Sequence, residues 1–390
     1  MADIPTRLID FVRDRFRTSG PVPLHAPAFG EAERENLLDC LSSTFVSSIG
    51  PYVDKFERAF ADRTGAVSAV AVVNGTAALH AALHLAGVGR GDLVVTQSLT
   101  FVATCNAISY CGAQPLFADV DRETLGLSPK AVDDLLSEHA EIRDGVTVMR
   151  ADGRRVQACV PMHTFGHPVD LDGLEVVCRK WGLALIEDAA EALGSLYLGR
   201  HVGLRGNVGA FSFNGNKIIT TGGGGMLVFA DEALALRARH LTTTAKVPHP
   251  WEFEHDEIGF NYRMPNLNAA LGHAQLGRLD GYLEAKRALA KGYAEQLAGS
   301  DYVFCVEPEG SRSNYWLCAV VCPDRAARDA FLRTTNDAGV FTRPVWTPMH
   351  RLSIYADAPR GLLSITEFLA ERLVNLPSAP TPRTIFNGVD

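Results

Sequence analysis

Short apolar runs alternate with longer amphipathic stretches over most of the chain from about residue 65 onward. Such short runs are typical of buried strands, and the stretches between them, such as 76–87 and 170–181, carry apolar residues at helical spacing. Regular alternation of strand and helix predicts an α/β domain with a mostly parallel sheet. The predicted strands are 68–73, 92–96, 115–118, 156–161, 183–187, 208–213 and 225–229.

The pattern changes in the second half of the chain. The strands 208–213 and 225–229 are too close together for a crossover helix, so one of them is expected to run antiparallel. The segment 246–265 is rich in aromatic residues, prolines and charges, and a long helical stretch follows at 266–298. The segment 300–390 has the pattern of a smaller α+β domain, with VFCVEP and YWLCAVV as strand candidates.

The length of 390 residues favours two domains over one. We expect an N-terminal segment and a large domain in 1–265, and a linking helix with a small C-terminal domain in 266–390. Leu8, Ile9, Val12 and Phe16 lie on one face of a predicted helix near the N-terminus.

The composition is that of a soluble globular enzyme, with 47% hydrophobic and 21% charged residues. The net charge of −8 argues against binding to nucleic acid or to a membrane surface, but not against a local pocket for an anionic ligand. The N-terminal stretch lacks the continuous apolar core of a secretory signal. None of the eight cysteines forms a CxxC pair, so we expect free thiols and a cytoplasmic protein.

Three motifs that carry candidate chemistry follow predicted strands. Ligands of open α/β sheets bind outside the carboxyl ends of the strands, so this placement indicates a site. In the first motif, Asn74-Gly75-Thr76 opens a predicted helix, whose free N–H groups favour a phosphate. Taken alone, this motif is equally consistent with a capped helix that binds no ligand.

The second motif, Glu187-Asp188 with Glu191, ends a buried strand. A buried carboxylate needs a partner, and a protonated ring nitrogen is suitable. When this motif stands alone, a helix cap or a structural salt bridge is the better explanation.

The third motif is FSFNGNKIITTGGGG, in which Ser212 supplies a hydroxyl and Lys217 an amine before the glycines 222–225. Lys217 lies outside any charged surface run, which favours a nucleophile over a solvated side chain. Phe101 follows another predicted strand and is a candidate for stacking on a planar ring, although a place in the core is the more common role of a phenylalanine.

Together, a phosphate cradle, a carboxylate for a ring nitrogen and a lysine amine match the needs of pyridoxal 5′-phosphate. A metal site is not expected. His163 and His167 are four residues apart, but the sequence between them is typical of a loop and no further ligand pattern completes a set.

The sequence resembles the DegT/DnrJ/StrS family of sugar aminotransferases along nearly the whole chain. The resemblance rests on STFVSSIGPYVDKFE near 43, NGTAAL at 74, TFVAT at 100, EDAAE at 187, FSFNGNKIITTGGGGM at 211 and GFNYRMPNLNAALG at 259. Within the family it looks most like the LegC-type enzymes, and perosamine synthases are similar but less so. The motifs that carry this likeness are PMHTFGHP, HLTTTAKVPHPWEFEHDEIGFNYR, SNYWL and TRPVW.

The resemblance implies the aspartate aminotransferase-like (type I) fold, pyridoxal 5′-phosphate as cofactor and a homodimer with composite active sites. Lys217 would be the catalytic Schiff-base lysine, Asp188 would bind the pyridine nitrogen, Glu191 would lie beside the ring and Phe101 would cover its face. The phosphate would be held by Gly75, Thr76 and Ser212, with Asn261 from the other subunit. The tentative substrate residues are His163, Arg263 and His350.

The implied reaction moves an amino group from L-glutamate to C4 of a nucleotide-linked 4-keto-6-deoxy sugar. In LegC-like members this sugar carries a 2-acetamido group, and the product feeds synthesis of legionaminic-acid-type sugars of surface polysaccharides. Two other readings are a sugar dehydratase on the same fold, in which histidine replaces the lysine, and a ligand-sensing protein without activity. Lys217 argues against the first, and the intact Asp188 and phosphate motifs argue against the second.

Overall fold

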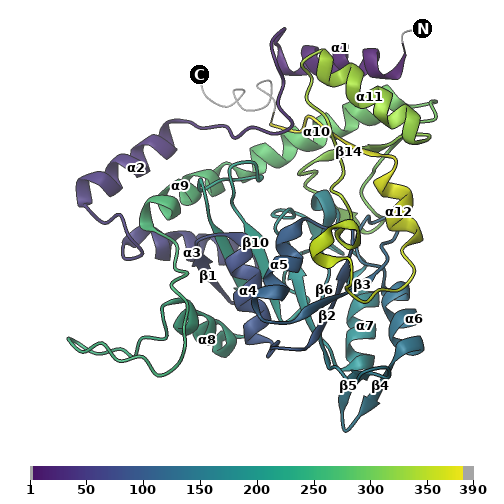
Figure 1. The fold of residues 1–390 in the computed structure, drawn as a ribbon. Helices are drawn as coiled ribbons and strands as arrows, with labels where there is room; N and C mark the ends of the chain where they lie inside the picture. Colours follow the sequence, from purple (N-terminus) through teal and green to yellow (C-terminus); the bar gives the residue numbers. More distant parts are fainter. Residues whose placement is uncertain (1–2, 381–390) are drawn as a thin grey trace.

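The computed structural model describes residues 3–380, so the ends of both expected domains, 1–2 and 381–390, lie outside the described residues. A seven-stranded sheet with the order β1-β11-β10-β7-β6-β2-β3 forms the centre of the molecule (Figure 1). Its strands are β1 (Ser68–Val72), β2 (Leu93–Gln97), β3 (Gln114–Ala118), β6 (Val156–Val160), β7 (Ala184–Asp188), β10 (Val208–Ser212) and β11 (Gly225–Phe229). Each lies close to its predicted bounds. β11 pairs antiparallel with β1 and β10, which confirms the expected antiparallel strand.

Helices cover both faces of this sheet because its strands are apolar on both sides. In β1, Val70 and Val72 belong to one apolar cluster, and Ala69 and Ala71 belong to another. The first face is covered by α4 (Gly75–Leu85), α5 (Val102–Tyr110) and α8 (Glu232–Thr242). The opposite face is covered by α3 (Pro51–Thr64), α6 (Pro129–His139), α7 (Leu171–Trp181) and α9 (Asn266–Gly277), and α2 (Glu31–Ser43) packs against α9.

The smaller C-terminal α+β domain is also present. The predicted helical stretch 266–298 is two helices, α9 and α10 (Leu279–Leu297), which meet at Arg278. A four-stranded sheet in the order β12-β14-β16-β15 follows, and VFCVEP and YWLCAVV contain two of its strands. The elements are β12 (Val303–Phe304), β14 (Cys318–Val321), α11 (Arg325–Asp337), β15 (Arg343–Pro344), α12 (Ser364–Ala370) and β16 (Leu373–Leu376), with the short 3₁₀ turns η2 (Met349–Arg351) and η3 (Ser353–Tyr355).

The cores divide the chain differently from the expected boundary at residue 265. Helix α1 (Ile4–Phe16) buries Leu8 and Val12 against Tyr293 and Phe331 of the small domain, so the first helix belongs with the C-terminal core. Helix α9 packs on the large domain. The apolar face of α1 was readable from its spacing, but spacing does not say which surface covers that face.

Short elements that the sequence pattern did not indicate complete the fold. They are the hairpin β4 (Ala140–Arg143) with β5 (Val146–Met149), the turn η1 (Thr164–Gly166), and the small sheet of β13 (Ser311–Arg312), β8 (Leu196–Tyr197) and β9 (Arg200–His201). In this small sheet β13 from the C-terminal domain pairs with β8 from the large domain, which ties the two domains together. Strands this short give no readable alternation, which is why the pattern missed them.

Candidate active site

A cavity of about 150 Å³ lies at the carboxyl ends of the parallel strands. Wider hollows occur elsewhere, such as one of about 580 Å³ beside Arg200, but the three candidate motifs meet in the smaller one. The residues around it include seven that the sequence singled out, namely Gly75, Thr76, Phe101, Asp188, Glu191, Ser212 and Lys217.

The start of α4 forms one wall of the cavity. The Asn74 side chain caps the helix by accepting a hydrogen bond of 2.7 Å from the Ala77 N–H, which leaves the neighbouring N–H groups at the helix start directed outward. A Cβ atom on Gly75 would lie 2.7 Å from Cβ of Ser212, so only glycine allows α4 to approach the end of β10 this closely. The N–H groups and two hydroxyls, from Thr76 and Ser212, suit a phosphate group.

Asp188 ends β7 beside the cavity and is almost fully buried, at 2% exposed. Its carboxylate accepts hydrogen bonds from Oγ1 of Thr104 at 2.8 Å and from the Ala190 N–H at 3.2 Å. Within residues 3–380 it forms no ion pair, and burial raises its pKa. A buried carboxylate without a cation is costly, so a protonated ring nitrogen in the cavity would supply its missing partner.

Lys217 and Glu191 lie together in the same cavity. Nζ of Lys217 is 3.4 Å from Oε1 of Glu191, and the other carboxylate oxygen of Glu191 accepts a 2.9 Å hydrogen bond from the Phe165 N–H. Burial raises the pKa of Glu191 to about 7, against an opposing effect of the Lys217 charge. This carboxyl group therefore changes its charge near neutral pH.

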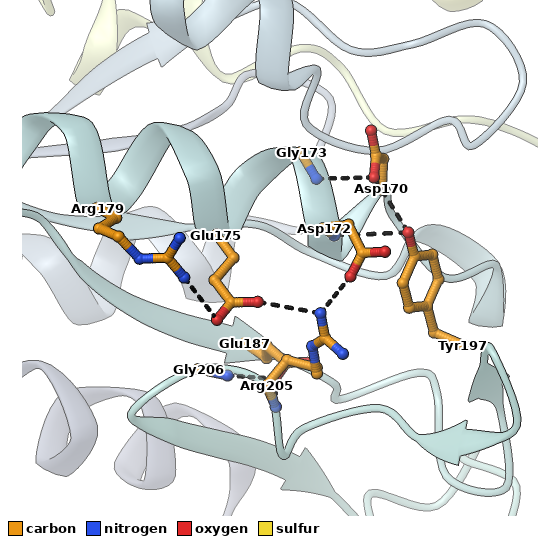
Figure 2. A network of polar contacts seen from close by, with 9 residues as sticks. All are labelled: Asp170, Asp172, Gly173, Glu175, Arg179, Glu187, Tyr197, Arg205 and Gly206. Atoms are coloured by element: carbon orange, nitrogen blue, oxygen red, sulfur yellow. Dashed lines mark hydrogen bonds and ion pairs between the residues drawn. The ribbon is translucent and has the colours of Figure 1, made fainter.

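Glu187, next to Asp188, is not among the residues that line the cavity and belongs to a polar network, part of which is drawn in Figure 2. It accepts hydrogen bonds from Nε2 of His163 at 3.1 Å and from the N–H groups of Gly203 and Gly206. Burial alone would raise its pKa, but these partners hold the pKa below the ordinary value for a glutamate. The network fixes the end of β7 and hence the position of Asp188.

The side chain of Arg205 connects the loop that contains Gly203 and Gly206 to α7. Figure 2 shows it between Asp172 and Glu175 of that helix, with 3.0 Å to the Glu175 carboxylate. Asp170 caps α7 by accepting from the Gly173 N–H at 2.9 Å and also accepts a hydrogen bond from the Tyr197 hydroxyl. Contacts from α7 and from the loop that contains Arg205 therefore hold the end of β7 in place.

The structure places the other sequence-derived residues in different surroundings. Phe101, half exposed, lies at the cavity with its ring centre 6.3 Å from that of Trp346. His163 is fully buried and is not among the residues that line the cavity. Its ring contacts Glu187, and its Nδ1 accepts from the Val169 N–H. This placement does not fit a side chain that faces the substrate, because both ring nitrogens are already used.

Three further candidates lie outside the residues that line the cavity. Arg263 forms a 2.6 Å ion pair with buried Glu57, which makes it part of the packing between α3 and β1. His350 lies between Ser98 and Glu367, at 2.7 Å from each. Asn261 bridges to Thr243 at the base of the segment 246–260, away from this chain's own cavity.

The motif reasoning missed residues that the tertiary structure brings to the site. Trp316 of the small domain lies with its ring centre 3.9 Å from Nζ of Lys217. Asn314 donates to the carbonyl groups of Glu191 and Leu193, at 2.8 and 2.9 Å. In the sequence this stretch carries a resemblance (SNYWL) and a strand-like pattern (YWLCAVV), and neither assigns chemistry to Asn314 or Trp316.

These residues fit pyridoxal 5′-phosphate by their chemistry. The glycine cradle at Gly75 offers space and N–H groups for a phosphate, and Lys217 offers an amine. Asp188 is a buried carboxylate that has no ion-pair partner among the residues that the structure describes. The fold and this site define the class of the protein: it has the architecture of the aspartate aminotransferase-like enzymes that use this cofactor.

Comparison with known proteins places the chain more closely. Residues 27–384 match the model of the DegT/DnrJ/EryC1/StrS aminotransferase family, and the chain belongs to this family. It is therefore an aminotransferase, and its cofactor is pyridoxal 5′-phosphate. It is 36% identical to a GDP-perosamine synthase of Escherichia coli O157:H7 over 360 residues, which covers 92% of this chain and 94% of the relative.

Two solved structures are also similar to this chain over most of its length. The aminotransferase TlmJ from Streptoalloteichus hindustanus superposes with a TM-score of 0.82 at 35% identity, covering 92% of this chain and 94% of its own. DesI, determined in the presence of its TDP-sugar product, gives a TM-score of 0.80 at 31% identity, with 92% and 88% covered. These relatives support the family and do not distinguish the LegC-type enzymes within it.

Proposed function

We propose that the protein transfers an amino group from L-glutamate to the C4 ketone of a nucleotide-linked 4-keto-6-deoxy sugar. The observation that carries the proposal is that one cavity holds the Lys217 amine and the buried Asp188 carboxylate, which forms no ion pair with any residue of 3–380. The GDP-perosamine synthase and the DesI structure with its TDP-sugar product support a nucleotide sugar as acceptor.

When bound, pyridoxal 5′-phosphate supplies an electron-withdrawing ring that stabilises negative charge on the carbon beside the transferred nitrogen. Asp188 holds the ring nitrogen in its protonated form, which maximises this withdrawal. The amine of Lys217 would accept the proton that leaves the amino acid carbon and would hold it during the transfer. Glu191 orients the Lys217 amine, and Phe101 would help to exclude water from the bound ring.

The second copy in the proposed homodimer supplies Asn261 to the phosphate. Apolar side chains are exposed on α2 and the loop after it, and on the segment 246–260, which both extend from the body of the molecule (Figure 1). They are Leu38, Leu41, Phe45, Ile49, Trp251, Phe253 and Ile258. Burial of this surface against a second copy favours the dimer.

Our proposal for the identity of the sugar rests on the resemblance of the sequence to the LegC-type enzymes. We propose a UDP- or GDP-linked 2-acetamido-2,6-dideoxy-4-keto-hexose, as in LegC-type enzymes of legionaminic acid synthesis. The 36% identity to a GDP-perosamine synthase favours a second candidate, a GDP-linked 4-keto sugar without the acetamido group.

In the part of the chain that the structure describes, no helix is both long and apolar enough to cross a bilayer. For the location of the protein we propose the cytoplasm.

The test is an absorbance titration of the purified protein. The lysine-linked cofactor absorbs at roughly 410–430 nm, and L-glutamate should convert this band to one at about 330 nm. UDP- and GDP-linked 4-keto sugars, with and without the 2-acetamido group, are then added to find which restores the first band. A sample that glutamate converts but no 4-keto sugar restores would refute the acceptor.

Lys217→Ala is the matching control variant. We expect it to keep the fold and lose turnover, because Lys217 is the one lysine among the described residues that line the cavity. Full turnover by this variant would sink the assignment of the lysine.

A further inference from the structure

Trp316 contacts the reactive amine from the opposite domain. Nζ of Lys217 is 3.9 Å from the centre of the Trp316 ring and 3.4 Å from Oε1 of Glu191. The amine therefore contacts two groups that attract a cation, a carboxylate and an aromatic face. Among aromatic side chains, the indole gives the strongest attraction of this kind.

Three hydrogen bonds hold the Trp316 residue in place. Its indole Nε1 donates to the carbonyl oxygen of Asn216 at 2.7 Å, and Asn216 directly precedes Lys217 in the chain. The Trp316 N–H donates to Oδ1 of Asn314 at 2.7 Å, and its carbonyl accepts from buried Lys286 at 3.1 Å. At 4% exposed, the indole has little freedom to leave the amine.

We propose that Trp316 is the positioning residue that holds the amine of Lys217 whenever this amine is not bonded to the cofactor. The proposal rests on the proposed function only in that amino transfer frees the amine once in each cycle. The indole face carries no proton that titrates near neutral pH, whereas the Glu191 carboxyl group has a pKa of about 7. The Trp316 contact therefore persists at pH values where Glu191 is partly uncharged.

A contact with the free Lys217 amine affects the equilibrium between two forms of the holoenzyme. Glutamate and water convert the lysine-linked holoenzyme to the form with an aminated cofactor, and 2-oxoglutarate and the free Lys217 amine result. A contact that stabilises the free amine favours this second form. Trp316→Leu removes the aromatic face and should shift the equilibrium toward the lysine-linked form by roughly tenfold.

The experiment measures the ratio of the two absorbance bands of the holoenzyme at a series of glutamate to 2-oxoglutarate ratios. Trp316→Phe keeps an aromatic face and should recover most of the shift that Trp316→Leu causes. Trp181→Leu is the matched control, because Trp181 also lies near a lysine amine, that of Lys180 at 5.2 Å, but on α7 and outside the cavity lining. The Trp181→Leu substitution should leave the equilibrium between the lysine-linked and the aminated form unchanged.

A second measurement needs no amino donor. Pyridoxamine 5′-phosphate is added to the lysine-linked holoenzyme, and loss of the long-wavelength band reports exchange into the form with a free Lys217 amine. Trp316→Leu should need roughly tenfold more pyridoxamine phosphate than the wild type. If glutamate fails to convert the wild type but this shift is found, the donor assignment fails and the role of Trp316 stands.

Two outcomes overturn the proposal. One is an exchange constant for Trp316→Leu within about twofold of the wild type, because the expected shift is roughly tenfold. The other is an equal loss in Trp316→Phe and Trp316→Leu, which assigns the effect to the indole N–H or to packing instead of the aromatic face. If Trp316→Leu fails to fold, Trp316→Met, which also lacks an aromatic face, takes its place with the same two limits.

Discussion

At the residue scale, Asp188 is the group whose charge matters most for the chemistry. Asp188→Asn keeps the size of the side chain but cannot hold a ring nitrogen protonated by charge. We expect the turnover rate to fall by roughly a hundredfold or more, with kcat measured by coupled detection of 2-oxoglutarate. Asp134→Asn, an exposed acid on α6, is the control. Near-normal kinetics of Asp188→Asn would refute the role of this carboxylate.

Glu191 makes the stability of the cofactor-free protein depend on pH. Burial raises its pKa from 4.5 to about 7, so between these values the folded chain keeps a proton that the unfolded chain releases. Stability contributed by this group is therefore present below pH 4.5 and falls as pH rises toward 7, by about 3 kcal/mol in total. Glu191→Gln should lack this slope in urea unfolding at several pH values, and parallel curves for the two proteins would contradict the prediction.

Residue identities at the site were readable from the sequence where each motif follows a strand. Asp188, Lys217 and the Gly75-Thr76 pair each follow a predicted strand, and in the structure they line one cavity. His163 shows the limit, because a position after a strand does not fix the direction of a side chain. In the folded protein the ring of His163 contacts Glu187, near the end of β7.

At the element scale, the close approach of α4 to β10 shapes the phosphate cradle. Gly75→Ala places a Cβ atom 2.7 Å from Cβ of Ser212, so the helix start must move away at a cost of about 1–3 kcal/mol. We expect cofactor affinity to fall roughly tenfold or more, as measured by titration with pyridoxal phosphate. Gly277→Ala, where an added Cβ meets nothing within 4 Å, should bind the cofactor like the wild type. Equal affinity of both variants would rule out the cradle.

The long elements were predictable and the short ones were not. Strands such as β1 and β7 have apolar runs that end in turn residues, and these signals are local. The pairing of β13 with β8 joins residues far apart in the chain, Ser311 with Tyr197. Two-residue strands leave no period to detect, so only the folded chain reveals them.

At the scale of the whole molecule, the first helix stabilises the last domain. Leu8 is 2% exposed within the core of α10 and α11. Leu8→Ala should cost about 2–5 kcal/mol of small-domain stability and lower the unfolding temperature in differential scanning calorimetry. Val176→Ala on α7, a position 60% exposed, should change little. An unchanged transition in Leu8→Ala would show that α1 is not part of this core.

The sequence by itself determined the layered α/β architecture, the antiparallel strand and the chemistry gathered at the strand ends, because hydrophobic period and glycine positions act over a few neighbouring residues. The tertiary structure decided which surface covers α1, why Glu191 titrates near neutral pH and which aromatic face meets Lys217. Each of these depends on burial or on contact between distant segments. Trp316 and Lys217 are brought together only when the small domain packs on the large one, and no local pattern encodes that contact.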